Sequence, residues 1–176
     1  PSHYHEKGDF GLNASVLDKY NKLGNTNKIV ILNTPNTSGN RDDYSFGDEE
    51  NIMMNSLLKY SDVMVTMFST MQIEAAIFDL PVVNYAIREI ADADYESTRL
   101  DPQGVMKMPH VSRILQTGGV KTATTFEELY SHINDYLDNP ALDSKGRKII
   151  EENFVGDFMG NGSEKTADYI HSLLYA

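Results

Sequence analysis

The stretch from Ser61 to Ile87 is the part of the sequence that most narrows the possible folds. Its apolar run Val63–Met67 is short and contains β-branched residues, which is typical of a buried parallel strand. A helical spacing of apolar residues follows and is stopped by Pro81, after which Val82–Ile87 is predicted as a second strand. The stretch therefore predicts a βαβ unit.

The turn between the first strand and the helix carries polar side chains suited to binding a ligand. Ser69 and Thr70 are good N-cap residues, and Glu74 lies within the first turns of the helix. Hydroxyls and free backbone amides at a helix start form a site for an anion. In an open α/β sheet this turn lies at the carboxyl edge of the strands, where ligands bind. The apolar face expected for the helix comprises Ile73, Ala76, Ile77 and Leu80.

Composition limits the classes of protein that remain. With 176 residues and 40% hydrophobic content, the chain is long enough for one domain with a sizeable core. No apolar run approaches the ~18 residues of a membrane helix. The absence of cysteine removes disulfides, thiolate metal sites and cysteine nucleophiles, and suits a cytoplasmic compartment. A net charge of -11 argues against nucleic acid or an anionic membrane as a partner.

The rest of the sequence alternates between helical and strand patterns. Further helices are expected over Ala14–Leu23, Asp48–Tyr60, Val111–Gln116, Phe126–Asp138, Ser144–Phe154 and Ser163–Leu174, and further strands over Lys28–Asn33 and Val120–Ala123. Thr125 and Glu128 have the spacing of a capping box. This order predicts an α/β fold with a parallel sheet flanked by helices.

Loops and chain ends complete the predicted organisation. Residues 1–13 are expected to be a loop, and residues 1–176 to form a single domain. The polar stretch 88–110 lacks periodicity, which favours a functional or mobile loop. Because the chain starts at Pro1 and no strand precedes the helix at Ala14, we expect a processed chain or a piece of a longer protein, with the first strand of the sheet upstream.

Several motifs occur together in an order that resembles one enzyme family. Residues 61–76 have the pattern S-D-x-x-x-x-x-x-S-T-x-x-x-E-A-A, and a loop with a histidine before a helix follows. GGVKTATTFEELYSHINDYLDNP, GRKIIEENF and a G-x-G-S helix start come next. Over residues 28–174 the chain resembles the C-terminal half of GT-B glycosyltransferases, in particular the bacterial and archaeal enzymes that build surface carbohydrates.

This resemblance implies a Rossmann-like domain that binds a nucleotide-sugar donor. Ser69 and Thr70 would contact the diphosphate, and Glu74 would accept hydrogen bonds from the ribose hydroxyls. His110 matches the family histidine in the loop after the second strand and would touch phosphate or sugar. Arg88, which follows that strand, would neutralise the diphosphate. The family's final helix start corresponds to Gly160, Gly162 and Ser163.

The resemblance also implies the reaction and its partners. The activity would be metal-independent sugar transfer from a nucleoside diphosphate sugar, without a cofactor, to a surface polysaccharide or glycoconjugate. The acceptor and usually the catalytic base lie on an N-terminal domain for which this chain has no room, so the chain alone is expected to be inactive or nearly so. The catalytic residues are therefore unassigned. Peripheral membrane association of a full-length protein stays open.

Other interpretations of the same residues stay open. Ser69 and Thr70 also fit plain helix caps, Glu74 a solvated helix face, His110 an exposed loop histidine and Arg88 a surface ion pair. Asp92-Ala93-Asp94 matches the D-x-D of another glycosyltransferase architecture and is interpreted as an acidic loop, while His3 and His5 lack further metal ligands nearby. Thr34-Pro35-Asn36 departs from the basic or His-Pro element often found there in the family.

Two alternative functions also remain. A sugar-nucleotide 2-epimerase of the same architecture typically has a glycine pair where this chain has Phe68-Ser69-Thr70. A non-catalytic α/β interaction module of the flavodoxin or receiver type is the other. A receiver would place an aspartate at the end of a strand, and no predicted strand end supplies one cleanly.

Overall fold

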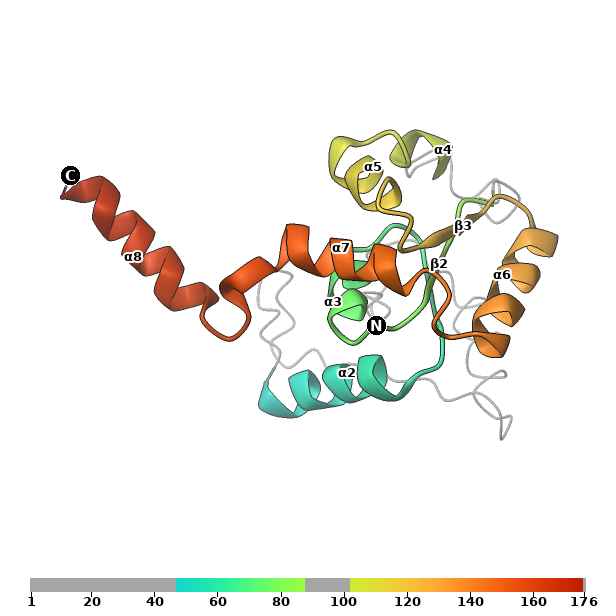
Figure 1. The fold of residues 1–176 in the computed structure, drawn as a ribbon, viewed down its shortest axis with the longest axis horizontal. Helices are drawn as coiled ribbons and strands as arrows, with labels where there is room; N and C mark the ends of the chain where they lie inside the picture. Colours follow the sequence, from blue (N-terminus) through green and yellow to red (C-terminus); the bar gives the residue numbers. More distant parts are fainter. Residues whose placement is uncertain (1–46, 88–101, 176) are drawn as a thin grey trace, which may run out of the picture. The chain divides into compact units, whose positions relative to one another are not determined.

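A computed structural model describes residues 47–87 and 102–175 (Figure 1). The chain divides into two compact units, Pro1–Met53 and Met54–Ala176. Of the first unit, only residues 47–53 are described, and they contain the beginning of helix α2 (Asp48–Tyr60). The elements predicted before residue 47 lie outside the described residues, as do Arg88 and the acidic loop at 92–94. The prediction of a single domain is therefore untested.

A three-stranded parallel sheet forms the centre of the second unit. Its strands are β1 (Met64–Thr66), β2 (Val82–Tyr85) and β3 (Lys121–Ala123), in the order β1-β2-β3. Val83 of β2 is paired with Val65 of β1 on one side and with Lys121 of β3 on the other. The first three residues of β2 are fully buried, as expected for a central parallel strand covered on both faces. The α/β class with a parallel sheet flanked by helices is confirmed, and the arrangement is consistent with a Rossmann-like fold.

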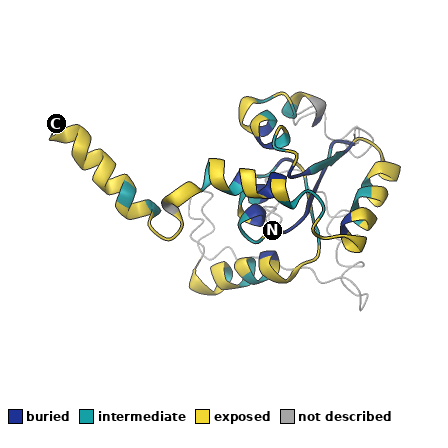
Figure 2. Ribbon diagram, viewed as in Figure 1, coloured by how far each residue is buried: buried dark blue, intermediate teal, exposed yellow. Residues whose placement is uncertain are grey.

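Helices cover both faces of this sheet (Figure 2). On one face, Val82 packs with residues of α3 (Met71–Ile77), α5 (Pro109–Leu115) and α7 (Ser144–Phe154). The buried members of this cluster are Leu58, Ala75, Ala76, Leu80, Val82, Ile114, Val120 and Ile150. On the other face, Val83 and Ala123 pack against Tyr136 of α6 (Phe126–Asp138). Alternation along β2 therefore separates two apolar layers.

The helix bounds largely agree with the sequence patterns. Helices α2, α6 and α7 have the predicted bounds, whereas the strands are shorter than predicted. Helix α5 begins earlier, at Pro109, because proline is favoured in the first helical turn. The expectation of an irregular segment over 88–110 is wrong for Pro102–Val105, which forms the short helix α4.

The C-terminal part of the described chain contains a 3-10 turn and a last helix. The turn η3 spans Gly156–Phe158, and helix α8 spans Gly162–Leu174. Asn161 occupies the N-cap of α8, and Gly160 before it has a positive φ of 77°. Within residues 47–87 and 102–175, no helix combines the length and apolar character needed to cross a membrane.

The start of α6 shows how local side chains fix a helix end. The Thr125 hydroxyl accepts a hydrogen bond from the Glu128 N–H at 3.1 Å, as the capping box predicts. The Glu128 carboxylate, however, accepts from the N–H and hydroxyl of Thr124, at 2.7 and 2.8 Å. These hydrogen bonds, the one from the Thr124 backbone first, lower the pKa of Glu128.

Candidate functional site

The turn between β1 and α3 follows the carboxyl end of β1 and has an unusual backbone. Phe68 has a positive φ of 48°, which is uncommon for a residue with a side chain. Its ring is buried in a small cluster with Ala86 and Val111. The Ser69 hydroxyl oxygen accepts a hydrogen bond from the Met71 N–H at 3.3 Å, so Ser69 satisfies a backbone donor of the first turn from the position before the N-cap, Thr70. Thr70 is exposed and makes no side-chain capping bond.

Two buried amides hold this turn against the central strand. The Asn84 side-chain oxygen accepts a hydrogen bond from the Phe68 N–H at 3.0 Å. The Asn84 amide nitrogen donates to the Gln72 side-chain oxygen, also at 3.0 Å. Asn84 is 0% exposed and Gln72 1% exposed, so both bonds lie in the interior. Residues on both sides of Ser69 and Thr70 are thus tied to β2.

Neither amide was predicted, although the sequence carries a signal for one of them. Asn84 interrupts the apolar run Val82–Ile87, and a polar residue inside a buried strand requires a partner. The predicted apolar face of α3 is also partly wrong, because Gln72, Ala75 and Ala76 are its buried residues. Ile73 and Ile77 are only half-buried. The helix turns Gln72 inward because Asn84 offers it a hydrogen bond.

The other predicted site residues lie on neighbouring elements. Glu74 is exposed on α3, and His110 is exposed in the first turn of α5. Val111, next to His110, packs in the same cluster as Phe68, so the β1–α3 turn and the start of α5 share one apolar contact. Among the described residues, no hydrogen bond joins the side chains of Ser69, Thr70, Glu74 and His110 to one another.

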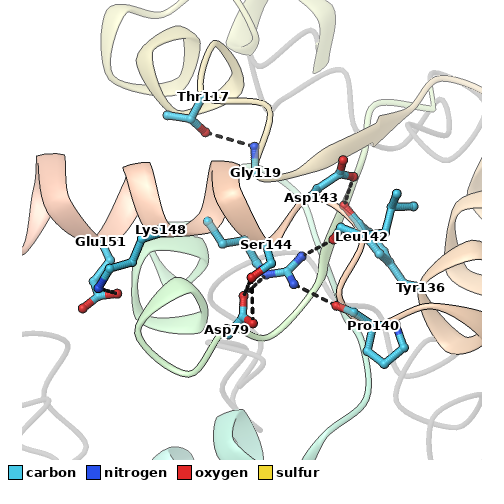
Figure 3. Close-up of polar contacts among 11 residues, drawn as sticks. Asp79, Thr117, Gly119, Tyr136, Pro140, Leu142, Asp143, Ser144, Lys148 and Glu151 are labelled. Atoms are coloured by element: carbon cyan, nitrogen blue, oxygen red, sulfur yellow. Dashed lines mark hydrogen bonds and ion pairs between the residues drawn. The ribbon is translucent and has the colours of Figure 1, made fainter.

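The opposite end of α3 is fixed by a different set of contacts. The Leu80 N–H donates to the Ala75 carbonyl at 3.0 Å and the Asp79 N–H donates to the Ala76 carbonyl at 3.1 Å, which is a Schellman motif. Asp79 has the positive φ of 51° that the motif requires. Its carboxylate accepts from the Ser144 hydroxyl, as Figure 3 shows. The predicted stop before Pro81 is therefore confirmed, with the last helical residue at Ile77.

A buried arginine joins that end of α3 to helix α7. The Arg147 side chain is 1% exposed, and its Nε donates to the Asp79 carboxylate at 2.7 Å. Its two terminal nitrogens donate to the carbonyls of Leu142 and Pro140, at 2.7 and 2.8 Å. All three nitrogens therefore have a partner, which is the condition for burying a charge.

Tyr136 lies beside this arginine, with the guanidinium 6.0 Å from its ring centroid. The Tyr136 hydroxyl donates to the Asp143 carboxylate at 2.9 Å. Burial, together with that hydrogen bond, raises the pKa of the Tyr136 phenol well above its usual value. The phenol therefore stays protonated and serves as a hydrogen-bond donor across the physiological pH range.

Two glycines let α7 approach the segment before β3 at backbone distance. A Cβ atom placed on Gly119 would overlap the backbone of Gly146, and the reverse also holds. The Thr117 hydroxyl accepts from the Gly119 N–H at 3.1 Å (Figure 3). It also donates to the Ile114 carbonyl at 2.7 Å. In the sequence, Gly118 and Gly119 follow the predicted helix Val111–Gln116. Their contact with Gly146 joins residues that are far apart in the sequence, so local sequence patterns do not reveal it.

The sequence and structure of this chain were compared with those of known proteins. The chain matches no family model, no curated protein and no solved structure. Within residues 47–87 and 102–175, no group of three or more His, Asp or Glu side chains is arranged to hold a metal ion. What the chain does must therefore be argued from the residues themselves.

Proposed function

We propose that this chain is the donor-binding half of a GT-B glycosyltransferase that transfers sugar from a nucleoside diphosphate to a surface polysaccharide or glycoconjugate. The observation that carries the proposal is the β1–α3 turn. It lies at the carboxyl end of a parallel strand, with Ser69 and Thr70 on the turn and Glu74 one helical turn later. That edge of an open α/β sheet is where nucleotides bind in other proteins.

The hydrogen-bonding state of the two hydroxyls fits a diphosphate. The Ser69 oxygen accepts from Met71, and no hydrogen bond donated by its hydroxyl is found within residues 47–87 and 102–175, so its proton can donate to a phosphate oxygen. Thr70 is exposed, and its side chain is not used for capping, so it offers a second donor. These neutral donors suit a chain whose net charge of -11 would otherwise repel an anion.

The remaining candidate residues complete the proposed donor site. The exposed Glu74 carboxylate would accept hydrogen bonds from the ribose hydroxyls. His110, at the start of α5, would contact phosphate or sugar. Arg88 would add a positive charge after β2. These groups would stabilise the leaving nucleoside diphosphate, while the acceptor and the base belong to another domain.

Calorimetric titration of the chain with UDP, GDP, CDP and their sugars tests this proposal. We expect one base to be bound, and we expect Thr70→Ala and Glu74→Gln each to weaken that binding about fivefold, the effect of one lost hydrogen bond. Glu127→Gln is the matched control, because Glu127 is an exposed acid in the first turn of α6. A folded chain that binds none of these compounds would overturn the proposal and favour a non-catalytic α/β module.

A further inference from the structure

We infer that Asn84 is the positioning residue of the nucleotide site, through its hold on the β1–α3 turn. This inference rests on the proposed function and adds a residue that does not itself touch the ligand. Asn84 lies in the central strand, on the face that α3 covers, because alternation places it on the same side as Val82. Its side chain therefore connects the core of the sheet to the turn that carries Ser69 and Thr70.

The buried location of Asn84 indicates that its polar side chain is needed for specific contacts. A carboxamide that is 0% exposed loses its hydrogen bonds to water, and apolar residues would fill a central strand without that loss. Both of its described partners belong to the turn and the first turn of α3. They are the Phe68 N–H before the two hydroxyls and the Gln72 carboxamide after them. Asn84 therefore acts as a clamp on residues 68–72.

The clamp holds the backbone of Phe68 in an unfavourable conformation. A positive φ of 48° is unfavourable for a residue with a Cβ atom, so the conformation persists only where its surroundings enforce it. Two contacts enforce it here: burial of the Phe68 ring beside Ala86 and Val111, and the bond from its N–H to Asn84. Without the second contact, the backbone can relax and move the Ser69 and Thr70 hydroxyls away from the sheet edge.

The chemistry of the clamp selects asparagine over related residues. The side chain must accept a hydrogen bond from the Phe68 N–H and donate one to the Gln72 oxygen at the same time. A carboxamide supplies both an acceptor and donors. An aspartate would supply only acceptors and bring a negative charge under the proposed diphosphate site. A leucine would keep the branched shape of asparagine but would supply neither a hydrogen-bond acceptor nor a donor.

Three variants separate positioning from stability. Asn84→Leu removes both hydrogen bonds, and Gln72→Met removes only the one to α3. The double variant Asn84→Leu/Gln72→Met leaves no buried side-chain carboxamide without a partner, so it should regain part of the stability lost in Asn84→Leu. It still lacks an acceptor for the Phe68 N–H. Its affinity for nucleotide should therefore stay low.

The measurements are the affinity for the nucleoside diphosphate that the wild-type chain binds best, and hydrogen exchange of the Phe68 amide. We expect Asn84→Leu to weaken binding about tenfold and Gln72→Met to weaken it less. The Phe68 amide should be protected in the wild-type chain and should exchange faster in both variants that lack Asn84. Ile150→Val is the control, because it trims the core at α7 and should leave affinity and Phe68 exchange unchanged.

The outcomes distinguish this inference from the proposed function. If the wild-type chain binds a nucleoside diphosphate and Asn84→Leu binds it equally well, the inference fails and the proposed function stands. Recovery of affinity in the double variant, in step with stability, would show a merely structural role and also overturn the inference. A wild-type chain that binds no nucleoside diphosphate overturns both. If Asn84→Leu does not fold, Gln72→Met decides, since unchanged affinity in that variant would contradict the clamp.

Discussion

The two ends of helix α3 both stabilise an unfavourable backbone conformation, but they do so through different kinds of contact. Each end has a residue other than glycine at positive φ, Phe68 at 48° before the helix and Asp79 at 51° after it. Neutral buried amides hold the first end, and a charged pair with the buried Arg147 holds the second. At the second end every arginine nitrogen is occupied, whereas the first end leaves the Thr70 side chain exposed. One end is an anchor, and the other is the proposed binding end.

The largest expected effect lies on the anchored side. Gly119→Ala places a Cβ on the backbone of Gly146, so α7 must shift away from the segment before β3. Overpacking against backbone is costly, and we expect a loss of about 3 kcal/mol in the free energy of unfolding, measured by urea denaturation. Gly162→Ala is the control, because a Cβ there meets nothing within 4 Å. Equal stability of the two variants would mean that the close contact between Gly119 and Gly146 does not position α7.

A smaller loss is expected when the charged pair is removed. Arg147→Met deletes the bonds to Asp79 and to the carbonyls of Leu142 and Pro140. Because Asp79 is 59% exposed, its carboxylate is rehydrated after the change, which keeps the loss near 2 kcal/mol. Lys148→Met on the exposed side of α7 is the control. If the two variants unfold at the same urea concentration, the anchoring role assigned to this end of α3 is wrong.

The smallest effects belong to the binding end. Ser69→Ala removes the hydroxyl that caps α3 and should lower the free energy of unfolding by about 1 kcal/mol. Thr70→Ala removes an exposed hydroxyl that makes no capping bond and should change stability by less than about 0.5 kcal/mol. Thermal and urea unfolding of this matched pair measure the difference. A larger loss for Thr70→Ala would mean that the assignment of capping to Ser69 is incorrect.

Local signals in the sequence predicted most of the regular structure. The bounds of α6 and α7 were predicted correctly from apolar periodicity, and for α6 the capping box of Thr125 and Glu128 also marked the start. Strands β1 and β2 were visible as short apolar runs. The end of β2 was overestimated, because Ala86 and Ile87 remain buried after its last residue, Tyr85.

The contacts that hold the candidate site were harder to predict, since they depend on the fold. A charged residue such as Arg147 is expected on a surface, and its burial follows only from three partners that the fold assembles. Gln72 resembles any polar helix residue until Asn84 is placed beside it. The Ser69 hydroxyl binds the Met71 N–H at the start of α3, where the N-cap residue is Thr70. The ligand contacts of Ser69, Thr70, Glu74 and His110 remain predictions, and Arg88 lies outside the described residues.

The contacts of Arg147 also bear on where this chain can be altered by insertion. Exposed loop tips usually accept extra residues or cleavage, and Asn139, Pro140 and Ala141 between α6 and α7 are exposed. Two carbonyls of this connection, however, are bound by a guanidinium that also binds the end of α3. A tag inserted here would disturb three elements at once. Solvent exposure alone is therefore a poor guide to tolerant sites in this protein.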